Sequence, residues 1–438
     1  MRIGGIIQTP AFSKEMKQRY TILIPQMLPI HFGFLARVFA GDGYRVEVLN
    51  TTHRGIVEEG LSSVHNDTCY PALLVIGQLV DALKSGAYDP HRTALLLTQT
   101  GGGCRASNYI SLLRKALERS GFDYVPVLSL NFSGLEKDNG VPLSLRAFAK
   151  VVYSLVYADF LMGLRNQCLP YEVHPGDCQK LVEYWTDALL KQMESPAFTR
   201  VHANYRAILR DFAALPMKKR DTVKVGIVGE IYLKYAPLGN NDLEAYLVSE
   251  GAEVVNSGLL DFCLYCAYNN VFDYRLYGTG RVRAGVSRIV ALFMERSQRK
   301  MIRAIKRHGV FRPPAEFARV AAMSEGYLDH GVKMGEGWLL TAEMLELIHS
   351  GVENIISAQP FGCLPNHIVA KGMIRKIRDN HPSANIVAVD YDPGASRINQ
   401  ENRIKLLLAN ARLIKEASLS VAVEAAEAPQ SRREEMPA

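Results

Sequence analysis

The chain has 438 residues, which is long enough for two or three domains with full cores. Its composition, 48% apolar and 22% charged, is ordinary for a soluble globular protein. Seven cysteines without regular spacing exclude a disulfide framework and indicate a reducing, cytoplasmic environment. Residues 1–12 lack the apolar core of a signal peptide. The most apolar stretch, 21–41, contains two prolines, a histidine and an arginine, so we expect no membrane span.

Strand and helix signals alternate in residues 1–143 and predict a first Rossmann-like lobe. Strands are expected at 20–27, 45–50, 93–99 and 124–130. Helices are expected at 30–40, 72–84 and 107–120, the last ending at the capping residue Gly121. A strand, a turn, a helix and a second strand in this order are typical of a parallel βαβ unit.

Residues 144–220 have helical apolar spacing almost throughout and predict a helical insert. A second Rossmann-like lobe is predicted for 221–418, with a largely helical stretch at 261–333. Its strands are expected at 222–228, 253–256, 354–358 and 385–391, and its helices at 240–250, 365–378 and 399–413. Residues 419–438 are rich in Ala, Glu, Pro and Arg and predict a disordered tail. The fold class is therefore α/β, with two parallel-sheet lobes and a helical insert.

The net charge of +7 is concentrated in one segment, residues 275–312, which we call the basic segment. It holds eleven Arg or Lys residues and one acid, Glu295, so the rest of the chain is about −3 by subtraction (+7 − 10). This pattern fits an anionic ligand such as a phosphate-bearing molecule, an acidic partner protein, or a solvated helix face. The basic segment has no RNA-binding signature and no interleaved aromatic residues, so we expect no nucleic acid.

Three isolated cysteines stand in similar surroundings: Cys69, Cys104 and Cys363. Each is preceded by turn-forming or polar residues and followed by a helix-like run, and at least the last two also follow a strand-like run. We therefore expect all three thiols on strand-to-helix turns at one edge of a sheet, where α/β proteins place their chemistry. Convergent thiolates would repel one another unless a metal neutralised them.

The spacing of these cysteines bears on the kind of metal. Zinc sites usually contain local pairs such as C-x₂-C, which the three cysteines lack, whereas cuboidal iron–sulfur clusters usually take four thiolates. Three would leave one iron open for substrate. The flanking residues expected to contact such a cofactor are Gly103, Arg105, Asn108 and Gly362. The alternative is that the thiols are ordinary buried apolar groups.

Other features are weaker signals. Cys263 and Cys266 form a C-x₂-C in an apolar helical run, where core packing, an auxiliary ligand and a redox pair are all open. Cys168 and Cys178 are expected to be incidental. No nucleotide-binding glycine motif is present, although 101–103 could form an anion-binding nest. Residues 390–394 and Glu230 each follow a strand, where a carboxylate could face a cleft or simply cap the next turn. Neighbours of the cysteines that could donate protons are His65, Asn66, Arg105 and His367.

At these residues the chain resembles the acyl-CoA dehydratase activase-related proteins, which are similar to the subunits of 2-hydroxyacyl-CoA dehydratases. The resemblance covers about residues 20–415 and is carried by five stretches: NDTCYPA (66–72), CRASNY (104–109), VGEI (228–231), QPFGCLP (359–365) and DYDPG (390–394). It implies a [4Fe-4S] cluster held by Cys69, Cys104 and Cys363 in a cleft between the lobes.

The resemblance also implies a function. A separate ATP-dependent activator would deliver one electron, and the chain would then act on a CoA thioester, by dehydration through a ketyl radical or by a related reduction. Activator modules, often fused upstream in the related family, are missing here, so the chain is expected to receive electrons. The alternatives are a non-catalytic electron-transfer or accessory subunit and a metal-free binding protein. The expected partners are the activator and an acyl-CoA or similar anionic ligand, in a homodimer or heterodimer away from membranes.

Overall fold

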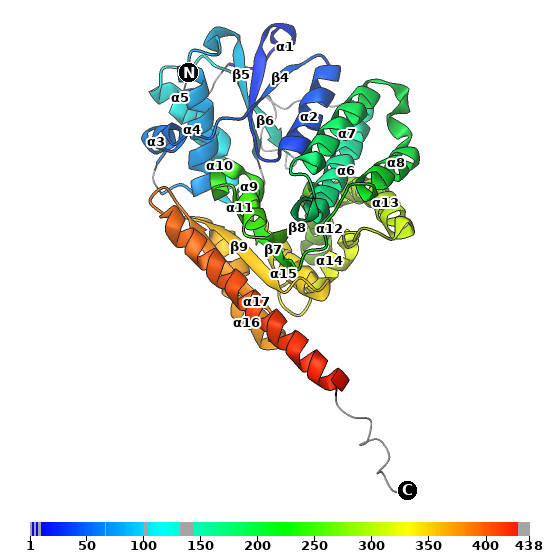
Figure 1. Ribbon diagram of the computed structural model, residues 1–438. Helices are drawn as coiled ribbons and strands as arrows, with labels where there is room; N and C mark the ends of the chain where they lie inside the picture. Colours follow the sequence, from blue (N-terminus) through cyan, green and yellow to red (C-terminus); the bar gives the residue numbers. More distant parts are fainter. Residues whose placement is uncertain are drawn as a thin grey trace.

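A computed structural model describes residues 2–3, 6–7, 10–65, 67–99, 103–131 and 144–427 (Figure 1). In its first lobe, four parallel strands lie in the order β4-β3-β5-β6. They are β3 (Thr21–Pro25), β4 (Arg45–Leu49), β5 (Thr93–Gln99) and β6 (Val127–Asn131). The helices between them are α2 (Pro29–Gly41), α3 (Gly55–Ser63), α4 (Tyr70–Lys84) and α5 (Tyr109–Arg119). The leucines at 95–97 in β5 are buried, which is why this central parallel strand reads as a continuous apolar run.

The second lobe contains another four-stranded parallel sheet, in the order β10-β9-β7-β8. Its strands are β7 (Val223–Gly229), β8 (Ala252–Asn256), β9 (Asn354–Pro360) and β10 (Asn385–Tyr391). Its helices are α9 (Ile231–Tyr235), α10 (Pro237–Asn240), α11 (Leu243–Ser249), α15 (Trp338–His349), α16 (Ile374–Asn380) and α17 (Arg397–Glu427). The two parallel sheets confirm the predicted α/β fold. One apolar core runs between the lobes and includes Leu95 of the first sheet and Ile356 of the second.

A helical layer forms beside both sheets (Figure 1). The predicted insert supplies α6 (Leu145–Cys168), α7 (Asp177–Glu194) and α8 (Val201–Ala213). It shares a single core with three helices of the next chain segment: α12 (Leu259–Tyr277), α13 (Arg281–His308) and α14 (Phe317–Met323). Among the described residues, only the stretch that begins with α6 is long and apolar enough to span a membrane, and 67% of that window is buried. Such burial is typical of a core helix in a soluble protein.

Several elements differ from the sequence-based expectation. A short antiparallel pair, β1 (Arg2–Ile3) and β2 (Ile6–Ile7), precedes α1 (Met16–Arg19). The helix expected at 365–378 is instead a π-helical turn, a 3₁₀ turn and α16. α17 continues to Glu427 because Ala, Glu and Leu favour helix, so part of the predicted disordered tail, 419–427, is helical. The rest of that tail, 428–438, lies outside the described residues.

The strand register places the ends of three strands of the second sheet side by side. Gly229 at the end of β7 pairs with Ala358 in β9, and Pro360 at the end of β9 pairs with Tyr391 of β10. Loops that leave these carboxyl ends therefore start from one edge, which is the usual site of ligand binding in open α/β sheets.

Candidate metal centre

Cys69 begins α4 and is 5% exposed. It follows α3 and not a strand, so the expected strand-to-helix setting is wrong for this thiol. Its Sγ lies 3.0 Å from the hydroxyl oxygen of Tyr109 in α5. The next backbone N–H, that of Tyr70, donates to the carbonyl oxygen of Phe361 at 3.0 Å and so links this turn to the second lobe. Burial raises the pKa of Cys69, and Glu230 raises it further.

Cys104 follows β5 and caps a 3₁₀ turn formed by Arg105–Asn108. Its carbonyl oxygen accepts a hydrogen bond from the Ser107 hydroxyl at 2.7 Å, which fixes the start of the turn. Burial raises the pKa of the Cys104 thiol to about 12, and the nearby Glu336 carboxylate contributes to this shift. The thiol is therefore protonated at neutral pH unless a cation binds beside it.

Cys363 follows β9 and is 6% exposed. Its Sγ accepts a hydrogen bond from the side-chain amide of Asn366 at 3.4 Å. Burial raises the pKa of Cys363 most, and the charges of Glu336 and Glu230 raise it further. The thiol thus lies at the carboxyl edge of the second sheet, on the strand-to-turn junction that the sequence predicts.

Close approaches between glycines and the cysteine turns bring the three positions together. A Cβ atom added to Gly362, whose φ is +72°, would lie 3.2 Å from the Cα of Cys69. A Cβ atom on Gly335 would lie 3.4 Å from the Sγ of Cys104 and 3.1 Å from Pro365, two residues after Cys363. The site therefore joins α4 and the β5 turn of the first lobe to the β9 turn of the second, and the positive φ of Gly335 and Gly362 favours glycine at both contacts.

The charges of two carboxyl groups act on these thiols. Glu230 follows β7, and its Oε2 accepts the backbone N–H of Leu233 at 3.0 Å, as a helix cap. Burial and the charge of Glu336 raise the pKa of Glu230 to about 8. Glu336 lies between two glycines, is 7% exposed, and accepts the backbone N–H of Ile231 at 3.0 Å. Sequence reasoning missed Glu336, because it lies in a loop without a recognisable motif, far along the chain from the cysteines.

The donor set fits a cofactor larger than a single ion. Among the described side chains, no three His, Cys, Asp or Glu groups lie close enough together to hold one metal ion. An iron–sulfur cubane needs thiolates that are spread around a bulkier body, and it prefers soft sulfur ligands. Two buried acceptor atoms have no hydrogen-bond partner: the amide oxygen of Asn366, whose amide nitrogen contacts Cys363, and the amide oxygen of Gln359 near the end of β9. Sulfur donors and unpaired polar atoms thus occur together at this edge.

The residues beside Cys104 that were expected to contact a cofactor differ in exposure and packing. A Cβ atom on Gly103 would lie 2.9 Å from the Sδ of Met334, so this glycine permits close packing of the 331–337 loop. Arg105 is exposed, and its charge acts to lower the pKa of Cys69 against the effect of burial. Asn108 is exposed at the junction of the 3₁₀ turn and α5. Asn66 and the glycines at 101–102 lie outside the described residues.

The remaining cysteines form two groups. Cys263 and Cys266 lie in α12, where burial raises the pKa of both thiols, that of Cys266 to about 12 with a contribution from Glu336. Cys168 and Cys178 are fully buried at the ends of α6 and α7, in the core of the helical layer. Of these four thiols, Cys266 is the one whose pKa the Glu336 carboxylate raises.

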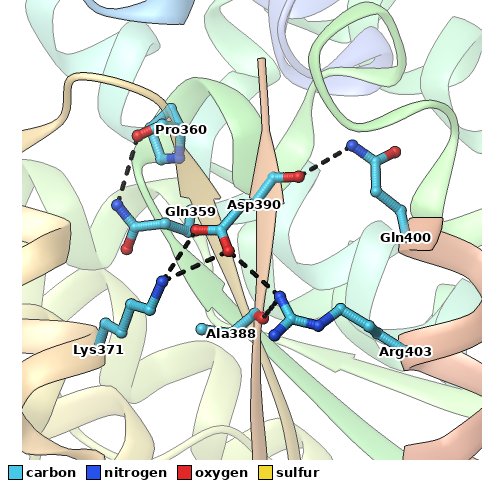
Figure 2. Close-up of polar contacts among 7 residues, drawn as sticks. All are labelled: Gln359, Pro360, Lys371, Ala388, Asp390, Gln400 and Arg403. Carbon is cyan, nitrogen blue, oxygen red and sulfur yellow. Dashed lines mark hydrogen bonds and ion pairs between the residues drawn. The ribbon is translucent and has the colours of Figure 1, made fainter. Parts of the chain in front are cut away.

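The carboxylate of Asp390, near the end of β10, is neutralised by two cationic side chains (Figure 2). Asp390 accepts hydrogen bonds from Lys371 at 3.2 Å and from Arg403 at 3.2 Å. Its backbone carbonyl oxygen accepts from the Gln400 amide at 3.0 Å. The side chain of Asp392 accepts a hydrogen bond from the backbone N–H of Gly394 at 2.7 Å, as expected if residues 390–394 form a capping turn.

No protein-family model and no curated protein sequence matches the chain. The geometry of the site and the resemblance of its motifs are therefore the basis for assigning a function.

A separate cavity of about 150 Å³ lies beneath the helical layer and is lined by none of the cysteines. Its wall includes a buried ion pair in which the Nζ of Lys234 lies 2.9 Å from both carboxylate oxygens of Glu343. These side chains are 3% and 9% exposed. Lys234 pairs with Glu343, and its charge also acts to lower the pKa of Glu336 against the effect of burial.

The basic segment covers the end of α12 and all of α13. Along one face of α13, the first turns expose Val282, Val286 and Ile289, and the later turns expose arginine and lysine. The single acid, Glu295, pairs with Arg299. The helix therefore presents an apolar patch followed by a basic patch at the surface of the helical layer.

Proposed function

We propose that this chain is an iron–sulfur protein in which Cys69, Cys104 and Cys363 hold a [4Fe-4S] cluster between the two lobes. The observation that carries the proposal is the convergence of three thiol-bearing turns, from distant parts of the chain, on one buried edge. Ordinary core cysteines have no reason to meet there beside two carboxyl groups. The resemblance to 2-hydroxyacyl-CoA dehydratase subunits supports the same three ligands.

The proposed reaction is the dehydration, or a related reduction, of a CoA thioester after transfer of one electron from an ATP-dependent activator. The bound cluster would supply one-electron and Lewis-acid chemistry at an iron that the three thiolates leave open. The chain holds Cys69 beside the Tyr109 hydroxyl and Cys363 beside the Asn366 amide, and both groups can donate to thiolate sulfur. Cys69 and Cys363 are largely shielded from water, at 5% and 6% exposed, whereas Cys104 is partly exposed.

The first test is the iron and acid-labile sulfide content of the chain, purified without oxygen. We expect about four of each per chain, as a single cuboidal cluster requires. Folded protein that contains neither would leave the cysteines as core residues and remove the proposal.

A non-catalytic electron-transfer or accessory subunit is the second candidate. It is favoured by the exposed apolar and basic patches of α13, which are suited to binding a partner protein. The electron-paramagnetic signal of the reduced protein separates the two functions: a catalytic site changes its signal when acyl-CoA is added, whereas an accessory subunit does not respond.

A further inference from the structure

The cavity beneath the helical layer follows the second sheet from one end of its strands to the other. Its outer end includes Arg312 and Ser350, which are both exposed. Ser350 precedes β9, and Arg312 pairs with Glu253 near the start of β8. At the inner end, Ser257 follows β8 and Lys234 is buried. The cavity therefore extends from exposed residues to buried polar groups near the carboxyl ends of the strands.

The outer end of the cavity has a fixed shape. The side-chain amide of Gln167 in α6 donates to the carbonyl oxygen of Arg312 at 3.2 Å and accepts the backbone N–H of the same residue at 2.8 Å. Two prolines, Pro313 and Pro314, follow in the cavity wall and restrict the backbone there. The loop at the entrance is thus tied to α6, so the cavity belongs to the folded protein before any ligand binds.

One position in the cavity wall is kept free of a side chain. Gly163 lies inside α6, where glycine is less favourable than alanine. A Cβ atom at this position would meet nothing within 4 Å, so no neighbouring atom requires glycine. Asp159 and Gln167, four residues before and after Gly163, also line the cavity, so a side chain at 163 would point into the same space. The glycine therefore preserves the volume of the cavity at the expense of helix stability.

The inner end of the cavity carries a carboxyl group with a neutral partner. Asp261 is 6% exposed, and its Oδ1 accepts a hydrogen bond from the side-chain amide of Gln298 at 2.7 Å. Burial raises the pKa of Asp261 well above its usual range, and the charges of Asp159 and Glu343 raise it further. A cationic group in the cavity would offset these effects.

The other two carboxyl groups at the inner end already have charged or backbone partners. Glu343 forms the ion pair with Lys234. The Oδ1 of Asp159 lies 2.7 Å from the Nε2 of His31 and accepts the backbone N–H of Leu259 at 2.8 Å. Asp261 is therefore the carboxyl group that is best placed to receive a cation from a ligand.

The wall also contains an unused hydrogen-bond acceptor and a large apolar surface. In the described part of the chain, the buried amide oxygen of Asn256 has no hydrogen-bond partner. Apolar side chains of both layers surround these polar groups, among them Ile227, Val254 and Met301. The cavity volume of about 150 Å³ is comparable to that of protein cavities that accept one benzene molecule. The site thus fits a compact ligand with an apolar body and a hydrogen-bond donor.

We propose that this cavity binds a small organic cation, a primary amine with an apolar body about the size of a benzene ring. Its ammonium group would donate to the Asp261 carboxylate, and its body would pack between the second sheet and the helical layer. None of the cysteines lines the cavity, so the inference is independent of the proposed metal centre.

The test measures binding of three ring compounds of similar size and different charge to the full chain by titration calorimetry at neutral pH. They are cyclohexylamine, cyclohexanol and cyclohexanecarboxylate. Cyclohexylamine should bind about tenfold more tightly than cyclohexanol, or better, because hydrogen bonds between charged groups are the stronger ones. The carboxylate should not bind. Equal affinities for the amine and the alcohol would overturn the choice of a cation, and no binding of any of the three would overturn the site.

Two variants locate the bound amine. Gly163→Leu fills the cavity without altering Asp261 and should abolish binding. Its matched control is Gly285→Leu, at a glycine inside α13 that also has nothing within 4 Å but does not line the cavity, and this variant should bind like the parent. Asp261→Asn keeps an acceptor for Gln298 and should lower the affinity for cyclohexylamine to that for cyclohexanol. Unchanged binding by Gly163→Leu would refute the proposal, and this variant decides the question alone if Asp261→Asn fails to fold.

Discussion

Replacement of Gly337 by alanine should disrupt the loop that carries Glu336. A Cβ atom at this position would lie 2.3 Å from the carbonyl oxygen of Val332 and 2.7 Å from the hydroxyl oxygen of Tyr265, while the backbone has a φ of +44°. The positive φ alone costs an alanine roughly 1–2 kcal/mol. The clash with fixed backbone adds about 1–3 kcal/mol, as overpacking does elsewhere. We therefore expect a loss of about 2–5 kcal/mol for Gly337→Ala.

Gly326→Ala is the control that separates the two effects. Gly326 also has a positive φ, +80°, but an added Cβ atom would meet nothing within 4 Å. This variant should lose only the conformational part, roughly 1–2 kcal/mol. Thermal unfolding followed by circular dichroism should show a decrease in midpoint for Gly337→Ala at least twice that for Gly326→Ala. Equal decreases would refute the argument that the close contacts, and not the backbone angle, define this loop.

Three further outcomes are expected. Cys363→Ala and Cys104→Ala should each lose most of the bound iron, whereas the control Cys168→Ala should retain it. Full retention of iron by either of the first two variants would refute the ligand assignment. Lys234→Met should destabilise the fold by about 3–5 kcal/mol because it leaves the Glu343 carboxylate buried without its cationic partner. The Lys234→Met/Glu343→Leu pair should recover much of this loss in thermal unfolding, and no recovery would contradict the ion-pair explanation. Charge reversal in the basic segment should weaken binding of CoA thioester or activator in titration calorimetry, and unchanged affinity for both would dismiss that role. The reversed positions are Arg299, Lys300 and Arg303.

The strands could be predicted from the sequence because parallel strands are buried on both faces. The leucine run of β5, set between polar segments, identifies that segment as a buried strand. The apolar runs of β9 and β10 identify those strands in the same way. α15, in contrast, gave no helical signal. Ten of its twelve residues are buried, so the period of 3.6 that marks an amphipathic helix is absent from Trp338–His349. Complete burial thus helps to recognise a parallel strand but conceals a short core helix.

The candidate site could be predicted from the sequence only in part. Turn residues around Cys104 and Cys363 are local features, and parallel topology brings the turns after such strands to one edge. The contribution of Glu336 depends on how the 331–337 loop folds back on the β5 turn, and no pattern of residue types near it encodes that contact. The setting of Cys69 was mistaken for a similar reason: its loop follows α3, and tertiary packing of α4 brings it to the edge.

The hydrogen bond from Tyr70 to Phe361 has a consequence for biosynthesis. It joins the beginning of α4 to the end of β9, and these segments leave the ribosome at very different times. While the first lobe is already folded, Cys69 and Cys104 have neither the β9 turn nor the Glu336 loop beside them. The cysteine turns therefore come together only when the second sheet packs against the first. A ligand that needs all three turns could bind only after the β9 turn has been synthesised.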